Sequence, residues 1–463
     1  MSVRNRARAS KIDALPDNRL ASVDEALFSG HRAAGLNLVI QTVWVYRHAV
    51  DFAELRRLHR KLGRGLLGRR IERSPLPFAR LGWVMDRGLP DIDIDIAESA
   101  RPPAELSDWA DDRSQLHVDA ELGPGWHCGV LPLTDGSTAV SLVLSHYLVD
   151  GVGLAGVLAD AIGGSTREPD YPPPRSRTRR RAVLEDARRT AGDLPEVARA
   201  VAAAGRLARR ARGELASSPA SRPVTLRADG GDDPVVVPAA WIEVDAHEWD
   251  ARAKDLGGTG TTLVAGFAAK FAELGGRRRA DDGVVTLHLP MNDRAEGDTR
   301  ANAMSIAIVR VDPTRVTADL GELRAAIKQA LTTLRETPDE ALQVRSLIPF
   351  TPKRALKRMV DAGFTDPDVP MLCSNLGDFD PIVCRLDGTD SELVMTRATG
   401  QGVTREWLEQ TGGQMTLQSW RTGGSTIYIT VNAFRPGAEN TKPAVRDLAA
   451  RTLAEFELTG RID

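Results

Sequence analysis

The sequence predicts an α/β protein with mixed sheets, folded as two lobes of similar size. Segments rich in apolar and β-branched residues alternate along the chain with segments whose apolar residues recur at helical spacing. A basic stretch rich in proline and alanine interrupts this alternation near the middle. At 463 residues, the chain is also too long for one typical core. We therefore expect an N-terminal lobe at 1–170, a crossover at 171–232 and a C-terminal lobe at 233–463.

The composition is that of a globular protein with no strong preference for nucleic acid. The net charge is −2, and apolar and charged residues make up 42% and 27% of the chain. The three cysteines, Cys128, Cys373 and Cys384, form no C-x-x-C pair, which argues against a disulfide framework and fits a reducing cytosol. No apolar run resembles a signal peptide or a membrane span, so a cytoplasmic protein is expected.

The first lobe begins with a predicted strand at 35–46 and a helix at 51–67 that Asp51 can cap. A short helix is expected at 106–116. The segments "WHCGVLPL" and "TAVSLVLSH" flank a "TDGS" turn, which is typical of a hairpin. An apolar-faced helix, "LAGVLADAI", follows Asp150.

The crossover at 171–232 contains a proline-rich segment followed by a long, basic, alanine-rich helical segment. Its arginines suggest a surface for an acidic carrier protein or for peripheral contact with a lipid layer. The plainer interpretation is a solvated linker helix, and both remain open.

The second lobe repeats the alternation of strands and helices without visible sequence similarity to the first. Strands are predicted at 234–245, 283–290, 303–312, 370–374, 391–398, 412–420 and 425–433, and helices at 262–275, 316–335, 340–362 and 441–458.

The segment "SLVLSHYLVDGVGLAG" at 141–156 supports two different functions. Gly151, Gly153 and Gly156 form G-x-G-x-x-G, which can cradle a dinucleotide if a second strand with an acidic residue comes after the helix. The next segment is instead proline-rich, with Glu168 in a predicted loop. An NAD(P)-binding oxidoreductase is therefore disfavoured.

The same segment contains H-x-x-x-D-G, formed by His146, Asp150 and Gly151. A neutral histidine where a strand ends can remove a proton from an attacking hydroxyl or amine. The plainer alternative is a structural histidine whose hydrogen bonds are satisfied.

Other segments accompany this motif in a recognisable order. They are "LASVDEALF" (20–28), "LPMNDRAEGDTRANAMSIAIV" (289–309), "CSNLGDFD" (373–380) and the late strand "STIYITVNAF". With the histidine motif, they resemble the superfamily of chloramphenicol acetyltransferase, nonribosomal-peptide condensation domains and wax ester synthase/diacylglycerol acyltransferases. One departure is that Ser145 replaces the first histidine of the family's H-H pair, whereas the catalytic second histidine is present as His146.

The resemblance implies a V-shaped pair of acetyltransferase-like lobes, a pseudo-dimer with a central tunnel. A thioester donor, either acyl-CoA or an acyl or peptidyl carrier protein, would meet a hydroxyl or amine acceptor at His146. His146 would act as general base, without a covalent enzyme intermediate and without a cofactor other than the donor's own phosphopantetheine. A catalytically silent relative that recruits a partner is the alternative, and the retained His146 argues against it.

The resemblance also implies roles for neighbouring residues. Asp150 would form a salt bridge with Arg294, and the backbone N–H of Gly151 would face the oxyanion. Ser374 and Asn375 of the crossover loop would line the tunnel, although Asn375 is equally well explained as a turn residue.

Ser145 is expected to contact substrate without being acylated. No metal site is predicted, because the alternating Asp91, Asp93 and Asp95 are typical of the solvated face of a strand. His117 and the pair His127-Cys128 have no recognised zinc spacing either.

Overall fold

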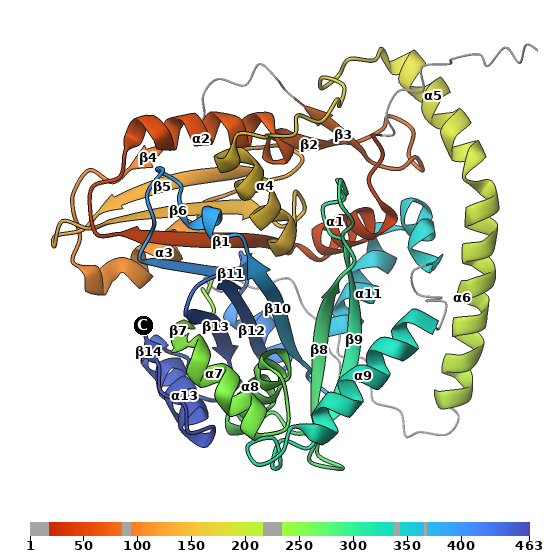
Figure 1. Ribbon diagram of the computed structural model, residues 1–463. Helices are drawn as coiled ribbons and strands as arrows, with labels where there is room; N and C mark the ends of the chain where they lie inside the picture. Colours follow the sequence, from red (N-terminus) through yellow and green to blue (C-terminus); the bar gives the residue numbers. More distant parts are fainter. Residues whose placement is uncertain (1–17, 86–93, 216–233, 337–342, 365–367) are drawn as a thin grey trace, which may run out of the picture.

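The computed structural model describes residues 18–85, 94–215, 234–336, 343–364 and 368–463. Two large sheets lie one above the other in the view of Figure 1, with helices on their outer faces. One sheet has five strands and the other has seven, and each contains both parallel and antiparallel pairs. The predicted α/β class with mixed sheets is therefore confirmed.

The five-stranded sheet has the strand order β11-β1-β6-β5-β4. Its strands are β1 (Asn37–Tyr46), β4 (Asp95–Ile96), β5 (Trp126–Pro132), β6 (Thr138–Ser145) and β11 (Leu393–Gln401). Around it lie α1 (Ser22–Ala34), α2 (Phe52–Arg64), α3 (Leu106–Gln115), α4 (Gly151–Gly163), the ribbon β2 (Arg69–Glu72) and β3 (Gly82–Met85), and the 3-10 turns η1 (Leu66–Gly68) and η2 (Pro103–Glu105).

The seven-stranded sheet has the order β14-β7-β13-β12-β10-β8-β9. Its strands are β7 (Ala239–Asp245), β8 (Val285–Asn292), β9 (Met304–Val311), β10 (Met371–Phe379), β12 (Gln414–Thr422), β13 (Thr426–Phe434) and β14 (Arg461–Ile462). The accompanying helices are α7 (Ala246–Asp255), α8 (Gly260–Leu274), α9 (Gly321–Glu336), α11 (Lys353–Phe364), α12 (Arg405–Gln410) and α13 (Lys442–Glu455), with the 3-10 turns η3 (Arg345–Phe350) and η4 (Pro381–Cys384).

Strand β11 connects the two halves of the chain. It follows the second-half strand β10 but pairs antiparallel with β1 in the five-stranded sheet. The division of the chain at 170 and 233 stays a prediction, and a strand from beyond 233 completes the first sheet.

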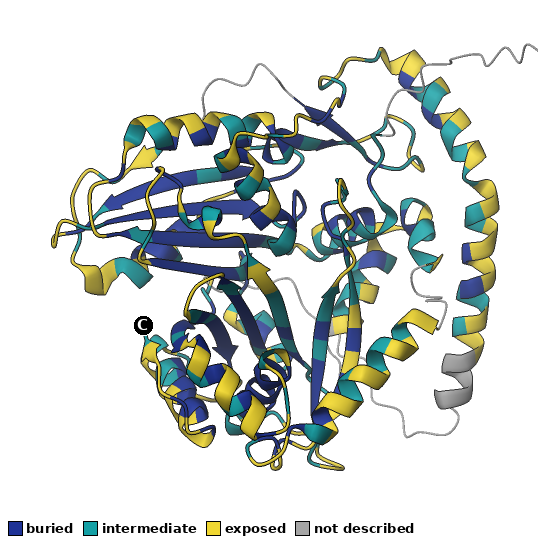
Figure 2. Cartoon of the chain, in the orientation of Figure 1, coloured by how far each residue is buried: buried dark blue, intermediate teal, exposed yellow. Residues whose placement is uncertain are grey.

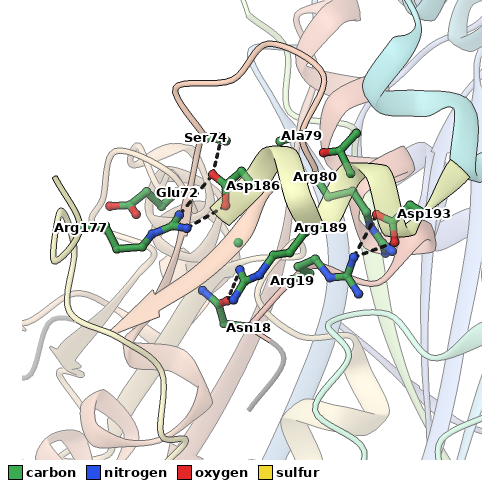
Figure 3. A pocket seen from close by; sticks show the side chains of 12 residues that line it. Asn18, Arg19, Glu72, Ser74, Ala79, Arg80, Arg177, Asp186, Arg189 and Asp193 are labelled. Carbon is green, nitrogen blue, oxygen red and sulfur yellow. Dashed lines mark hydrogen bonds and ion pairs between the residues drawn. The ribbon is translucent and has the colours of Figure 1, made fainter. Parts of the chain in front are cut away.

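In the described part of the crossover, residues 171–215, a non-helical stretch is followed by the helices α5 (Arg179–Gly192) and α6 (Leu194–Leu215). Together they form a long rod at the edge of the molecule (Figure 1). Three contacts attach the start of this rod to residues that precede the crossover (Figure 3). Ser74 donates to Asp186 at 2.5 Å, Arg19 pairs with Asp193 at 2.9 Å, and Arg189 donates to Asn18 at 3.4 Å. Within the crossover itself, Arg177 pairs with Asp186 at 2.7 Å.

The predicted helix at 340–362 is wrong in part. The structure has the 3-10 turn η3, which contains Pro349, and then α11, which begins directly after Pro352. Proline lacks the backbone N–H and restricts the residue before it, so two prolines divide the segment.

Burial follows the sheets. The strands are mostly buried and the outer faces of the surrounding helices are exposed (Figure 2). In α2 the apolar spacing seen in the sequence buries Leu55, Leu58 and Leu62, and the Asp51 carboxylate caps the helix by accepting from the N–H groups of Ala53 and Glu54.

Candidate functional site

His146 lies directly after the last residue of β6, in the five-residue loop that leads to α4. Backbone hydrogen bonds hold this loop at both sides. The N–H of His146 donates to Leu38 O of β1 at 2.9 Å, and the N–H of Leu148 donates to Ser145 O at 2.9 Å. The His146 residue is half-buried, and its Nδ1 is buried without a hydrogen-bond partner in the described part of the protein.

Burial lowers the pKa of His146 below its usual value. The charge of Asp150, the backbone of His146 itself and the Asn302 side chain act in the opposite direction but are weaker. The imidazole is therefore neutral at pH 7, which is the form that can accept a proton.

The predicted ion pair between Asp150 and Arg294 is present, with 2.8 Å between Asp150 Oδ2 and Arg294 Nη2. The side chains are only 9% and 12% exposed. Asp150 also caps α4, because its Oδ1 accepts from the N–H of Gly153 at 2.7 Å. Its Oδ2 accepts a further bond from the N–H of Ala303 at 2.9 Å.

Arg294 is fixed by more than this carboxylate. It lies in the β8–β9 loop (residues 293–303) and donates to three backbone carbonyls of that loop, Asp298 O, Arg300 O and Ala301 O, at 2.9–3.1 Å. The backbone of Asp150 also binds this loop, since the N–H of Asp150 donates to Ala301 O at 2.7 Å. The loop is thereby attached to the start of α4 at several points.

Of the three glycines of G-x-G-x-x-G, Gly151 and Gly153 have close neighbours, whereas Gly156 is exposed and a Cβ there would meet, beyond its own turn of helix, no atom of the described residues within 4 Å. A Cβ on Gly153 would lie 2.5 Å from the Val149 side chain and 3.0 Å from the Arg294 guanidinium, so only glycine allows the arginine to approach. After α4, residues 164–178 form no strand, and the next element is α5. The dinucleotide interpretation therefore lacks the second strand that it requires.

Two residues that sequence reasoning did not select complete the site. Asn302 is 1% exposed, and its Nδ2 donates to His146 O at 3.3 Å. Asp24 of α1 accepts from the N–H groups of Ala301 and Asn302 at 2.9 and 2.7 Å. Both residues lie inside segments quoted for the resemblance, so the signal was present in the sequence.

A buried arginine, Arg69, is hydrogen-bonded to the histidine loop. Arg69 is 0% exposed, and its guanidinium lies 3.9 Å from the centre of the Trp83 ring. It donates to Leu148 O at 2.5 Å and to Thr299 O at 2.6 Å, and so joins the histidine loop to the β8–β9 loop. No motif in the sequence marks this residue.

A second histidine lies near the site. His31 of α1 is hydrogen-bonded through Nδ1 to Tyr147 Oη at 2.9 Å. Burial, with repulsion from His146, lowers the pKa of His31 to about 4. Both imidazoles are therefore uncharged at pH 7.

The remaining predicted residues are placed differently. Ser145 is 0% exposed, and its Oγ accepts from the N–H of Tyr147 at 3.4 Å, so Ser145 does not line the site in this structure. Ser374 and Asn375 lie half-buried on β10, and the Asn375 side chain accepts from the N–H of Gly377 at 3.0 Å. This local bond favours the turn role of Asn375. Gly151 is the first residue of α4.

Neither thiolate nor metal chemistry is indicated within the described residues. Burial raises the pKa of Cys128 and Cys373 to about 12, so both thiols are protonated. No group of three or more His, Cys, Asp or Glu side chains in this part of the chain is arranged to hold a metal. Asp95 forms an ion pair with Arg113, whereas Asp91 and Asp93 lie outside the described residues.

In the described part of the chain, no helix has the length and apolar character needed to cross a membrane.

Comparison with solved structures places the chain in a fold class. It has the fold shared by nonribosomal-peptide condensation domains and wax ester synthases. The first condensation domain of the CDA synthetase superposes with a TM-score of 0.54 at 14% identity, covering 96% of this chain and 98% of that one. No protein-family profile matches the chain, and no curated protein sequence matches it either.

Two further structures have the same fold. The wax ester synthase/diacylglycerol acyltransferase from Marinobacter aquaeolei VT8 gives a TM-score of 0.53 at 14% identity, covering 95% of this chain and 98% of that one. The starter condensation domain of rhizomide synthetase, in complex with C8-CoA, gives 0.52 at 15% identity, covering 95% and 94%.

Proposed function

We propose that the protein is an acyltransferase that moves an acyl group from a thioester donor to a hydroxyl or amine acceptor. The observation that carries the proposal is His146, a half-buried residue directly after the end of β6 whose imidazole Nδ1 has no hydrogen-bond partner among the described residues and whose pKa burial lowers. The fold supports the same reaction class, since both wax ester synthases and condensation domains share it.

In the proposed reaction, His146 removes the proton from the acceptor O–H or N–H as the acceptor attacks the thioester carbonyl. The tetrahedral intermediate then collapses, and the carbon–sulfur bond breaks. The imidazolium returns its proton to the departing thiolate, so the products are an ester or amide and a free thiol. General-base catalysis of this kind contributes about 10²–10⁴-fold.

Asp150 acts here as a positioning residue. Its carboxylate is occupied by Arg294 and by two backbone N–H groups, and it holds the start of α4 against the β8–β9 loop. The N–H of Gly151, at the N-terminus of α4, is a candidate donor to the oxyanion, where the helix dipole also favours negative charge.

The donor is proposed to be an acyl-CoA or an acyl group on a carrier protein. One protein with this fold, the rhizomide starter condensation domain, was solved in complex with C8-CoA, and another structure with this fold is a nonribosomal peptide synthetase. The test is a screen of acyl-CoA donors against pooled alcohols and amines, with free thiol release and product mass as readouts. Thiol release that requires both acceptor and His146 supports the proposal, whereas equal release by His146→Ala contradicts it.

A further inference from the structure

The rod that α5 and α6 form at the edge of the molecule is strongly basic (Figure 1). Residues 179–215 contain ten arginines, no lysine and five acidic residues, a net charge of +5 in a chain whose total is −2. The two helices keep one register across Asp193. The N–H of Asp193 donates to Arg189 O and the N–H of Val197 donates to Asp193 O, each four residues back, so positions on α5 and α6 can be compared along one axis.

The inner side of the rod holds three of its five acidic residues, each bound to another part of the molecule. Figure 3 shows two of them, Asp186 and Asp193, facing Ser74 and Arg19. The third, Glu196, accepts a hydrogen bond from a serine hydroxyl of η3. These carboxylates therefore lie against the molecule and away from the outer face of the rod.

The outer side of the rod exposes arginines and apolar side chains. Leu184, Leu194 and Val201 are 62%, 57% and 57% exposed. None of the acidic residues at 179–209 is in the exposed class. The arginines that are exposed beside the apolar side chains include Arg188, Arg199, Arg206 and Arg209.

We propose that the outer face of this rod binds along the surface of an anionic phospholipid bilayer. Arginines attract lipid phosphates, and exposed apolar side chains on the same helix enter the boundary between headgroups and acyl chains. The long arginine stems can lie along the apolar side chains while the guanidinium groups stay at the phosphates. The charge and the apolar side chains of the outer face therefore fit the same partner.

The length of the rod favours a bilayer over an acidic carrier protein. From Arg179 to Leu215 the two helices rise by about 55 Å, whereas a small domain is about 30 Å across. A carrier protein would cover about half of the outer face. A planar surface contacts all of it, including Leu184 near one end and Arg209 near the other.

Sedimentation of the whole protein with lipid vesicles tests the proposal. Vesicles of phosphatidylcholine alone are compared with vesicles in which about a third of the lipid is phosphatidylglycerol, at low and at high salt. At low salt, we expect partition onto the anionic vesicles to exceed partition onto the neutral ones at least about tenfold, and this preference should shrink as salt screens the charges. Equal partition onto the two kinds of vesicle overturns the proposal.

A pair of arginine substitutions tests the location. Arg188→Gln combined with Arg199→Gln should weaken partition onto anionic vesicles about 25-fold, because each arginine near such a surface contributes about fivefold. Arg60→Gln combined with Arg64→Gln is the matched control. It removes the same charge from exposed positions of α2, away from the rod (Figure 1), and should change partition less than about twofold.

A pair of leucine substitutions tests the apolar contact at unchanged charge. Leu184→Gln combined with Leu194→Gln should weaken partition at least about tenfold at low and at high salt, because salt does not screen apolar burial. Both positions are exposed, and circular dichroism checks that each variant keeps its helices. Unchanged partition of either the arginine pair or the leucine pair overturns the proposal.

A purified acidic acyl carrier protein serves as a second probe. Carrier binding that is lost in Arg188→Gln with Arg199→Gln, without binding to any vesicle, assigns the rod to a carrier protein and overturns the bilayer. The measurements need neither an acyl donor nor an acceptor, so their outcome does not depend on whether the protein transfers acyl groups.

Discussion

Removing Arg294 should destabilise the protein strongly, because it leaves a buried carboxylate without its counter-charge. In Arg294→Ala, Asp150 keeps only the backbone N–H groups of Gly153 and Ala303 as partners. Breaking a buried ion pair in this way costs about 3–5 kcal/mol. The loop carbonyls of Asp298 and Arg300 would also lose the donor that Arg294 provides, whereas Ala301 O would keep the N–H of Asp150.

Replacing Asp150 should lower the free energy of unfolding by less than replacing Arg294 does. In Asp150→Asn, the guanidinium of Arg294 keeps the three carbonyl acceptors of its own loop, and the amide oxygen can still cap α4. We expect about 1–3 kcal/mol, the usual cost of an impaired buried hydrogen bond. The double variant should cost less than the sum of the two, with a coupling of about 1–3 kcal/mol, because both changes remove the same interaction.

Thermal unfolding and urea titration of the four proteins measure this coupling. An unfolding entropy of about 2.1 cal/mol/K per residue converts a cost of about 3–5 kcal/mol into a loss of roughly 3–10 °C in Tm, depending on whether one half or the whole chain unfolds together. Arg315→Ala is the matched control. The ion pair of Arg315 with Glu322 is exposed, at 59% and 68% for the two side chains, and should be worth under about 1 kcal/mol. Additive effects of the Asp150 and Arg294 changes would refute the reasoning.

Four further outcomes are expected. His146→Ala should lower acyl transfer at least about 100-fold while the unfolding midpoint stays near that of the parent, and near-normal turnover would exclude the general-base role. Because the pKa of His146 is lowered, the acidic limb of the kcat/KM profile should lie below pH 6.5, and a limb at about pH 7 or above would contradict the neutral base. Intact-mass measurement after incubation with donor alone should find no adduct on Ser145, which is fully buried. Burial raises the pKa of Glu25 to about 7, so the folded state holds a proton that the unfolded state releases near pH 4.5. The free energy of unfolding should therefore fall as the pH rises from about 5 to 7. Glu25→Gln should flatten that dependence.

The sequence predicted the parts of the fold that depend on local patterns. The strand at 35–46, the helix capped by Asp51 and the hairpin before His146 all form within a few residues of their expected bounds. Periodicity and capping residues act over one or two turns, so they can be read without knowing the rest of the chain.

Features that depend on distant segments were harder to predict. Strand β11 has the pattern of an ordinary strand of the second half, and nothing in its own residues indicates that it pairs with β1. Arg69 gave no signal in the sequence, because its two shortest hydrogen bonds go to the backbone carbonyls of Leu148 and Thr299, which any residue supplies. The ion pair of Asp150 and Arg294 was expected only through the resemblance.

The placement of His146 depends on both halves of the chain. Its carbonyl accepts from Asn302, and Asn302 lies in the β8–β9 loop, which Asp24 and Asp150 hold from the first half. Without that loop, Asp150 would lose Arg294 and the N–H of Ala303, and an unpaired buried charge is costly. Asp24, whose pKa burial raises, would lose the N–H donors of Ala301 and Asn302. Docking of the loop and formation of the histidine site are therefore one event. This coupling explains why a short motif identifies the base but cannot, by itself, describe what holds it in place.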